Sequence, residues 1–211
     1  QRLKMQPKNL RVIIQGFVNA GSHVARLLSE RGMKVIGVSD STTTLFNENG
    51  LDVGELIASK DKGALFAKNA RNISPAQLLE QECDVLIPAA LSDAITQANV
   101  ENIRAKIILE LANAPVSPEA DEKLFEKGVR VIPDILANAG GVVVSYLEGV
   151  QNASNYYWTE KTVNEKLDEI MSQAFIDVFE ESRQKNISFR NAAYVLAINR
   201  ITAAEKLRGN Y

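Results

Sequence analysis

The sequence of 211 residues has very little histidine and cysteine, with only His23 and Cys83. Histidine-based catalytic triads and histidine-rich metal sites therefore have nothing to build on. One cysteine forms no intramolecular disulfide, which fits a reducing cytosol and predicts a cytoplasmic protein. No apolar run approaches the roughly 18 to 20 residues that a membrane-spanning helix needs. We therefore expect neither a metal site nor a membrane partner.

An excess of charge of one sign is also lacking. The 24 basic and 26 acidic residues leave a formal net charge of -2, which is too balanced to predict binding to nucleic acid. There is no P-loop lysine motif, which argues against an ATPase or a GTPase. The apolar residues that follow Cys83 predict its burial, which would raise the pKa of the thiol and weaken it as a nucleophile. The classes that remain are those that act on small molecules.

The sequence does contain short, β-branched apolar runs separated by amphipathic segments. The runs RVIIQG, MKVIGVSD, CDVLIPAAL, AKIILELA and VRVIPD are typical of buried parallel strands. Helices are predicted between them at 22–31, 54–60, 74–81, 96–103 and 118–127, two of them beginning with the N-caps Ser74 and Ser117. Alternating strands and helices predict an α/β fold, a Rossmann-like doubly wound, mostly parallel sheet.

The pattern changes near residue 150, and helical periodicity dominates from Thr162 onward. We expect a single domain over 1–211, with a Rossmann core at 1–150 and a carboxy-terminal helical layer at 151–211. One apolar stripe expected to face the core comprises Leu167, Ile170, Met171, Ala174, Phe175, Val178 and Phe179. A second comprises Ala192, Ala193, Leu196, Ile201 and Ala204.

The first predicted strand leads into a turn that resembles a dinucleotide fingerprint. In the pattern G-x-G-x-x-G, Gly16 and Gly21 supply the first and third glycines, and Val18 replaces the second. The second glycine normally lets the backbone approach the pyrophosphate, so Val18 weakens the site on paper. A helix beginning near Asn19 still offers free N–H groups to an anion. The alternative is a βα turn that uses glycine for geometry alone.

Asp40 closes the second predicted strand, 24 positions after Gly16. This is close to the spacing of about 20 residues expected for an acid that binds the adenosine ribose. Because Ser39, Asp40 and Ser41 are all good turn formers, a purely structural turn is the alternative.

Five segments together resemble the coenzyme-binding domain of the glutamate, leucine, phenylalanine and valine dehydrogenase family, most closely glutamate dehydrogenase. They are DVLIPAAL, ITQANV, AKIILELANAPVSPEAD, VIPDILANAGGVVVSYLEGVQN and RNAAYVLAINRI. The resemblance runs from about Leu10 to about Arg208. It implies an oxidoreductase that converts an L-amino acid to a 2-oxo acid and ammonia, with hydride transfer to NAD or NADP.

The resemblance also implies residue roles. Val142 and Ser145 would close over the substrate side chain, and Ser145 could donate to a distal carboxylate. The implied coenzyme-binding residues are Gly16, Phe17, Val18, Asn19, Ala20, Gly21, Asp40, Ser41, Ala89, Ala90, Asn113 and Asn138.

No catalytic residue is expected in this chain, because the family carries its catalytic lysines and aspartate in a preceding substrate domain. We therefore expect the isolated chain to be inactive. We also expect it to be a monomer or dimer, in contrast to the oligomer of a full-length family member.

Four positions depart from the family pattern along the expected coenzyme path: Val18, Thr43, Thr44 and Leu111. They leave open an alternative function, a degenerate noncatalytic module that binds a nucleotide or a partner protein. The choice between NAD and NADP also stays open. Asp40 would repel a 2′-phosphate, but Lys60, Lys62 or Lys68 could offset the repulsion.

Overall fold

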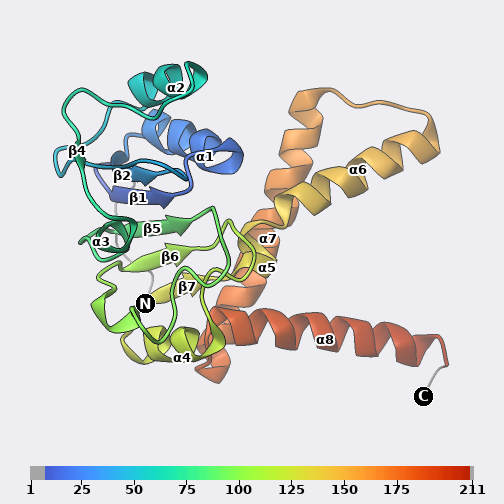
Figure 1. Cartoon of the computed structure of the whole chain (residues 1–211). Coiled ribbons are helices and arrows are strands. Elements are labelled where there is room, and N and C mark those ends of the chain that lie inside the picture. Colours follow the sequence, from blue (N-terminus) through green and yellow to red (C-terminus); the bar gives the residue numbers. More distant parts are fainter. Residues whose placement is uncertain (1–7, 210–211) are drawn as a thin grey trace. The chain divides into compact units, whose positions relative to one another are not determined.

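The structure is a computed structural model that describes residues 8–209. Its strands within this range form one sheet in the order β4-β3-β2-β1-β5-β6-β7 (Figure 1). All five predicted strands are present, and β3 and β4 add an antiparallel edge beside β2 that periodicity over two or three residues does not reveal. The strands are β1 (Arg11–Gln15), β2 (Lys34–Ser39), β3 (Thr44–Phe46), β4 (Arg71–Asn72), β5 (Val85–Pro88), β6 (Ile107–Leu109) and β7 (Arg130–Ile132).

The strand order reverses at β1, which pairs in parallel with β2 on one side and with β5 on the other. Gln15, the last residue of β1, is in register with Ser39 of β2 and with Pro88 of β5. The carboxyl ends of the three strands therefore meet at one edge. In open α/β sheets, ligands bind outside this edge at the point where the strand order reverses.

Helices connect the strands much as the sequence predicts. Ser74 caps α3 through a complete capping box with Gln77, and Ser117 caps α4. None of the helices between residues 8 and 209 is long and apolar enough to span a membrane. The helices are α1 (Asn19–Glu30), α2 (Val53–Asp61), α3 (Pro75–Leu79), the 3-10 turn η1 (Val100–Asn102), α4 (Pro118–Glu126), α5 (Asp134–Ala137), α6 (Gly140–Ser154), α7 (Glu160–Lys185) and α8 (Phe189–Leu207).

The helix predicted at 96–103 is wrong, since only η1 forms there. The Asn99 side chain accepts from Thr96 N–H at 2.9 Å and donates to Ala94 O at 2.9 Å. Side-chain bonds of this kind to the local backbone compete with helical hydrogen bonds. They hold the segment as a loop that ends in a single turn.

Alternate side chains of β1 point to opposite faces of the sheet. Val12 and Ile14 belong to a buried cluster with α1 and α2, whereas Ile13 belongs to a second cluster with α3 and α4. All three side chains are fully buried. Burial on both faces is the property that makes a central parallel strand read as a continuous apolar run. It confirms the doubly wound fold.

The chain divides into two compact units, 1–131 and 132–211. The break falls at the end of β7, and the expected single domain with a boundary near residue 150 stays a prediction. The second unit has its own buried cluster, composed of Leu136, Val178, Ala192 and Ala193.

The two predicted carboxy-terminal stripes are only partly buried. On α7, Val178 is buried, but Ile170 and Phe175 are 40% and 39% exposed. On α8, Ile201 is 64% exposed and Ala204 is exposed as well, so the prediction that they face a core is wrong. Helical periodicity identifies the apolar face of a helix, but it contains no information on what covers that face.

Cys83, two residues before β5, is fully buried, as predicted. Burial raises the pKa of its thiol to about 12, so almost no thiolate exists near neutral pH. We expect a thiol reagent such as DTNB to leave the native chain unlabelled and to modify one thiol per chain after denaturation. Rapid labelling of the native chain would contradict this buried environment.

Candidate functional site

The turn after β1 brings the chain into close contact with the end of β5. Gly16 adopts a φ of +99°, and a Cβ at this position would lie 2.8 Å from Ala90 Cβ and 2.9 Å from the backbone of Ala89. The N–H groups of Gly16 and Phe17 both donate to Ser39 O, at 2.9 and 2.5 Å. Only glycine fits here, because both the left-handed φ and the contact exclude a side chain.

Gly21 supplies the close packing of helix on strand that the third glycine of the motif provides. A Cβ at Gly21 would lie only 1.9 Å from Gly16 O. This contact presses the first turn of α1 against the turn that follows β1. The two glycines therefore depend on each other, and the spacing of the motif follows from this packing.

The amino end of α1 has no side-chain cap among the described residues, in contrast to α2, α3 and α4. Ser22 N–H donates to Val18 O at 2.9 Å, which leaves the N–H groups of Asn19, Ala20 and Gly21 in the unpaired first turn of the helix. These groups and the positive end of the helix dipole favour an anion.

Phe17 and Val18 occupy the same turn but differ in exposure. The Phe17 side chain is fully buried in the cluster under α1 and α2, so only its backbone can face a ligand. Val18 is 55% exposed and immediately precedes α1. Its side chain is therefore open to solvent at the amino end of α1.

The other predicted residues of the first unit also follow strand ends. Ala89 N–H donates to Gln15 O at 2.7 Å, and Ala90 is exposed. Asn113 is exposed in the loop after β6, and Ser41 is exposed directly after Asp40. The structure thus gathers the ends of β1, β2 and β5 where the strand order reverses.

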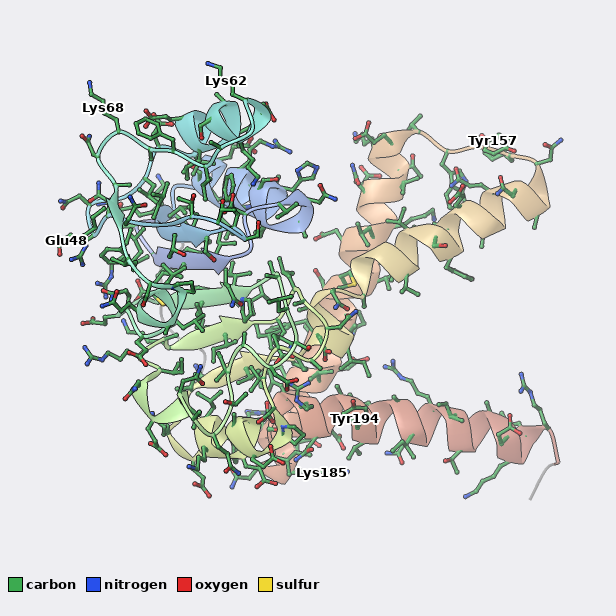
Figure 2. All side chains as sticks on the ribbon, viewed as in Figure 1. Glu48, Lys62, Lys68, Tyr157, Lys185 and Tyr194 are labelled. Atoms are coloured by element: carbon green, nitrogen blue, oxygen red, sulfur yellow. The ribbon has the colours of Figure 1, made fainter. Side chains whose placement is uncertain are left out.

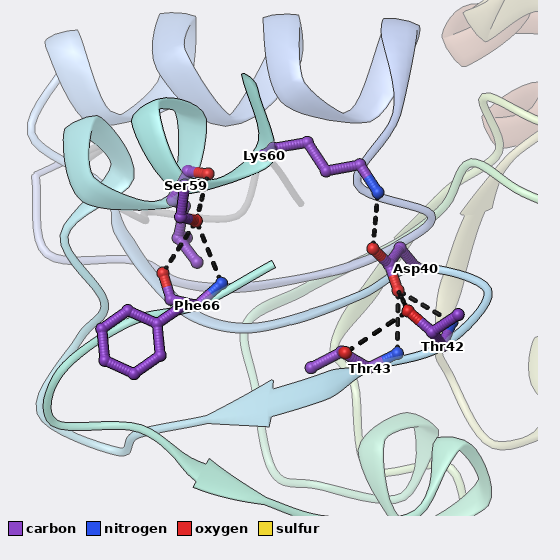
Figure 3. Close-up of polar contacts among 7 residues, drawn as sticks. Asp40, Thr42, Thr43, Ser59, Lys60 and Phe66 are labelled. Carbon is purple, nitrogen blue, oxygen red and sulfur yellow. Dashed lines mark hydrogen bonds and ion pairs between the residues drawn. The ribbon is translucent and has the colours of Figure 1, made fainter. Parts of the chain in front are cut away.

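Asp40 accepts four hydrogen bonds (Figure 3). Its Oδ1 accepts from Thr42 N–H at 2.8 Å, Thr42 Oγ1 at 3.0 Å and Thr43 N–H at 2.8 Å. Its Oδ2 accepts from Lys60 Nζ at 2.5 Å. The predicted turn at Asp40 is therefore confirmed, and its contact with a ribose stays a prediction. Thr42 was not predicted, although an Asp followed by two threonines is a signal for such a turn.

The pKa of Asp40 reflects two opposing influences. Burial of the side chain, which is 2% exposed, raises its pKa, but the hydrogen bonds from Lys60, Thr42 and Thr43 outweigh burial and lower the pKa to about 2. The carboxylate is therefore ionised at any physiological pH.

Two of the departures from the family pattern have structural explanations. Thr44 is a buried residue of β3, in register with Ser39, so it belongs to the sheet. Leu111 packs against the cluster under α1 and α2, and its N–H donates to Pro88 O at 3.0 Å. The N–H of Thr43 donates to Asp40 Oδ1. Among the four departures, Val18 is the one that stands in front of α1.

The remaining predicted residues lie in the second unit. Asn138 ends α5, and its N–H donates to Asp134 O at 3.0 Å. Val142 is 75% exposed on α6, and Ser145 is exposed on the same helix. Both side chains on α6 are therefore accessible.

The environment of Asp40 predicts a pH dependence of stability. Its pKa falls from 3.8 to about 2 on folding, so its contribution is complete above about pH 4 and is lost as the pH falls toward 2. We expect Asp40→Asn to lower the free energy of unfolding by about 2 kcal/mol near neutral pH, and by progressively less below about pH 4. Urea unfolding followed by circular dichroism measures this, and a pH-independent difference would show that charge is not the cause.

Comparison with known proteins places this site in context. The family model described as glutamate/leucine/phenylalanine/valine dehydrogenase matches residues 1–209. The NAD-specific glutamate dehydrogenase of Staphylococcus aureus (strain COL) is 44% identical over 210 residues, which are 99% of this chain and 51% of that protein. The chain thus spans about half the length of the curated relatives that it matches.

Solved structures agree in fold. A hetero-hexameric glutamate dehydrogenase from Thermus thermophilus in its leucine-bound form superimposes with a TM-score of 0.91 at 30% identity, over 100% of this chain and 50% of that one. Glutamate dehydrogenase from Peptoniphilus asaccharolyticus has a TM-score of 0.85 at 37% identity, over 100% of this chain and 50% of its own. The chain belongs to the glutamate, leucine, phenylalanine and valine dehydrogenase family.

Proposed function

We propose that this chain binds NAD or NADP and is the coenzyme-binding part of a glutamate-type amino-acid dehydrogenase. One observation carries the proposal. Gly16 touches Ala89 and Ala90 across the point where the strand order reverses, and Gly21 packs α1 against the same turn. A Cβ at either glycine would clash within this turn, and the amino end of α1 that follows it has no side-chain cap. A dinucleotide fits such a turn.

In this proposal, different site residues contact different parts of the coenzyme. The first-turn N–H groups of α1 bind the pyrophosphate, and Asp40 with Ser41 lies beside the adenosine ribose. Ala89 and Ala90 line the groove with small side chains. Asn113 and Asn138 hold the nicotinamide ribose and carboxamide. The relatives named as NAD-specific favour NAD as the physiological coenzyme.

The proposed reaction is oxidative deamination of an L-amino acid to a 2-oxo acid and ammonia. The coenzyme accepts the hydride from the amino-acid Cα. Val142 and Ser145, both exposed on α6, contact the substrate side chain, and the Ser145 hydroxyl donates to its distal carboxylate. A hydroxyl that satisfies a buried carboxylate would favour glutamate over apolar amino acids.

The whole protein is proposed to be an oligomer. The Thermus thermophilus relative is described as a hetero-hexamer, and this chain spans half of that relative. The 211-residue chain by itself is proposed to be a monomer or dimer.

Coenzyme binding is testable by isothermal titration calorimetry of the 211-residue chain with NAD+. We expect binding in the micromolar to low-millimolar range, tightened several-fold to about tenfold by Val18→Gly. The reason is that the 55% exposed Val18 side chain crowds the approach to the α1 N–H groups.

The matched control is Val144→Gly, which removes a 39% exposed valine from α6, outside the phosphate turn and the proposed substrate contacts. It should leave the affinity for NAD+ within about twofold of the parent chain. If neither the parent nor Val18→Gly binds any nicotinamide coenzyme, the dehydrogenase proposal fails and a noncatalytic module becomes the better description.

Catalysis by the isolated chain is the next test. In the family, the lysines and the aspartate that perform the acid–base chemistry precede the coenzyme domain, and positioned general acids and bases contribute about 10²–10⁴-fold each. We expect no L-glutamate-dependent formation of NADH above the background without enzyme, even where calorimetry shows coenzyme binding. The formation of NADH is followed by its absorbance at about 340 nm. Turnover by the 211-residue chain would mean that it holds catalytic groups of its own.

A further inference from the structure

Three lysines near the second strand are candidates to influence Asp40, and only one of them contacts it in the structure. Lys60 Nζ lies 2.5 Å from Asp40 Oδ2. Lys62 and Lys68 are both exposed and point outward into solvent (Figure 2). The structure therefore selects Lys60, and the consequence below rests on the proposed binding of a dinucleotide in this unit.

The position of Lys60 is set by the structure around it. Lys60 lies in the last turn of α2. The preceding residue, Ser59, accepts from Phe66 N–H at 3.0 Å, and its Oγ lies 3.0 Å from Phe66 O (Figure 3). These bonds tie the end of α2 to the following loop. The backbone from which the Lys60 side chain reaches Asp40 is thus itself anchored, and the ammonium is held by its bond to Asp40.

The pair leaves donors for a further anion. An ammonium group has three N–H donors, and Lys60 uses one of them on Asp40. The Lys60 side chain is 32% exposed while that of Asp40 is 2% exposed, so a ligand that approaches from solvent meets the cation more readily than the carboxylate. The hydroxyl of Thr42 is also at the surface of this turn.

The charges decide what the site accepts. A 2′-phosphate carries a charge of up to about -2 near neutral pH, and an unpaired Asp40 would repel it. The Lys60 ammonium cancels the carboxylate charge and places N–H donors within reach of the same region. A ribose 2′-hydroxyl, in contrast, needs only a hydrogen-bond partner and no neutralising charge.

We infer that Lys60 sets the coenzyme specificity of this chain, by neutralising Asp40 and donating to the 2′-phosphate, so that the site accepts NADP(H) as well as NAD(H). The pairing makes the acid at the end of β2 compatible with both coenzymes. Without the lysine, the same acid would select against the phosphate.

The test is the ratio of the dissociation constants for NADP+ and NAD+, measured by calorimetry on the 211-residue chain and its variants. We expect Lys60→Met to raise this ratio about tenfold or more, because a charge-assisted contact is lost and Asp40 is left unpaired. Lys60→Arg, which keeps the charge, should keep the ratio within about threefold. Lys62→Met and Lys68→Met are matched controls that remove the same charge elsewhere and should leave the ratio unchanged.

Thermal unfolding of each variant shows whether the fold is intact, and Asp40→Asn adds an independent check. Because it removes the repulsion directly, it should lower the ratio. The inference is overturned if the parent chain binds NAD+ but not NADP+, or if Lys60→Met and Lys62→Met give the same ratio; the proposed function survives both results. Absence of binding to every coenzyme by the parent chain would overturn the proposed function, and this inference with it.

Discussion

Gly21 lies against the carbonyl oxygen of Gly16 so closely that a Cβ at Gly21 would stand 1.9 Å from it. This contact fixes where α1 starts relative to the end of β1. Gly16 in turn has no room for a side chain because Ala90 and the backbone of Ala89 fill that space. The ends of β1 and β5 are therefore locked together at the point where the strand order reverses, and the geometry of the candidate site within the first unit depends on this packing.

A second constraint is electrostatic. Asp40 is an almost fully buried carboxylate at the end of β2, and burial alone would favour its protonated form. Three hydrogen bonds from the turn that follows and one from Lys60 reverse that preference. The same bonds that keep Asp40 charged also hold the turn in shape. The turn role of Asp40 is thus confirmed, and it does not exclude the proposed contact with a ribose.

The helices of the second unit leave much of their apolar surface exposed. Its helices bury a small cluster around Val178 and Ala192, yet they expose large apolar side chains such as Ile201 along their length. An amphipathic helix normally buries its apolar face against another element. Within the described residues, α7 and α8 cover each other only in part, so the sequence pattern of these helices contains more apolar surface than the unit itself buries.

Local patterns in the sequence determined much of this structure. The five apolar runs became strands, Ser74 and Ser117 became helix caps, and Gly16 and Gly21 took the roles that their spacing implied. These features depend on backbone sterics and on hydrogen bonds between neighbours in the chain, so the residues themselves are enough. The helix predicted at 96–103 does not form, because the Asn99 side chain makes hydrogen bonds to the backbone groups of this segment.

Only the tertiary structure decided the rest. Three lysines were equally plausible partners for Asp40 by sequence, and folding of α2 over the sheet brought Lys60 alone into contact. Thr44, which was expected in the loop after Asp40, lies in the sheet because β3 pairs with β2. The sequence likewise could not predict that the apolar face of α8 is exposed. Periodicity shows which side of a helix is apolar, whereas burial depends on which distant segment arrives to cover it.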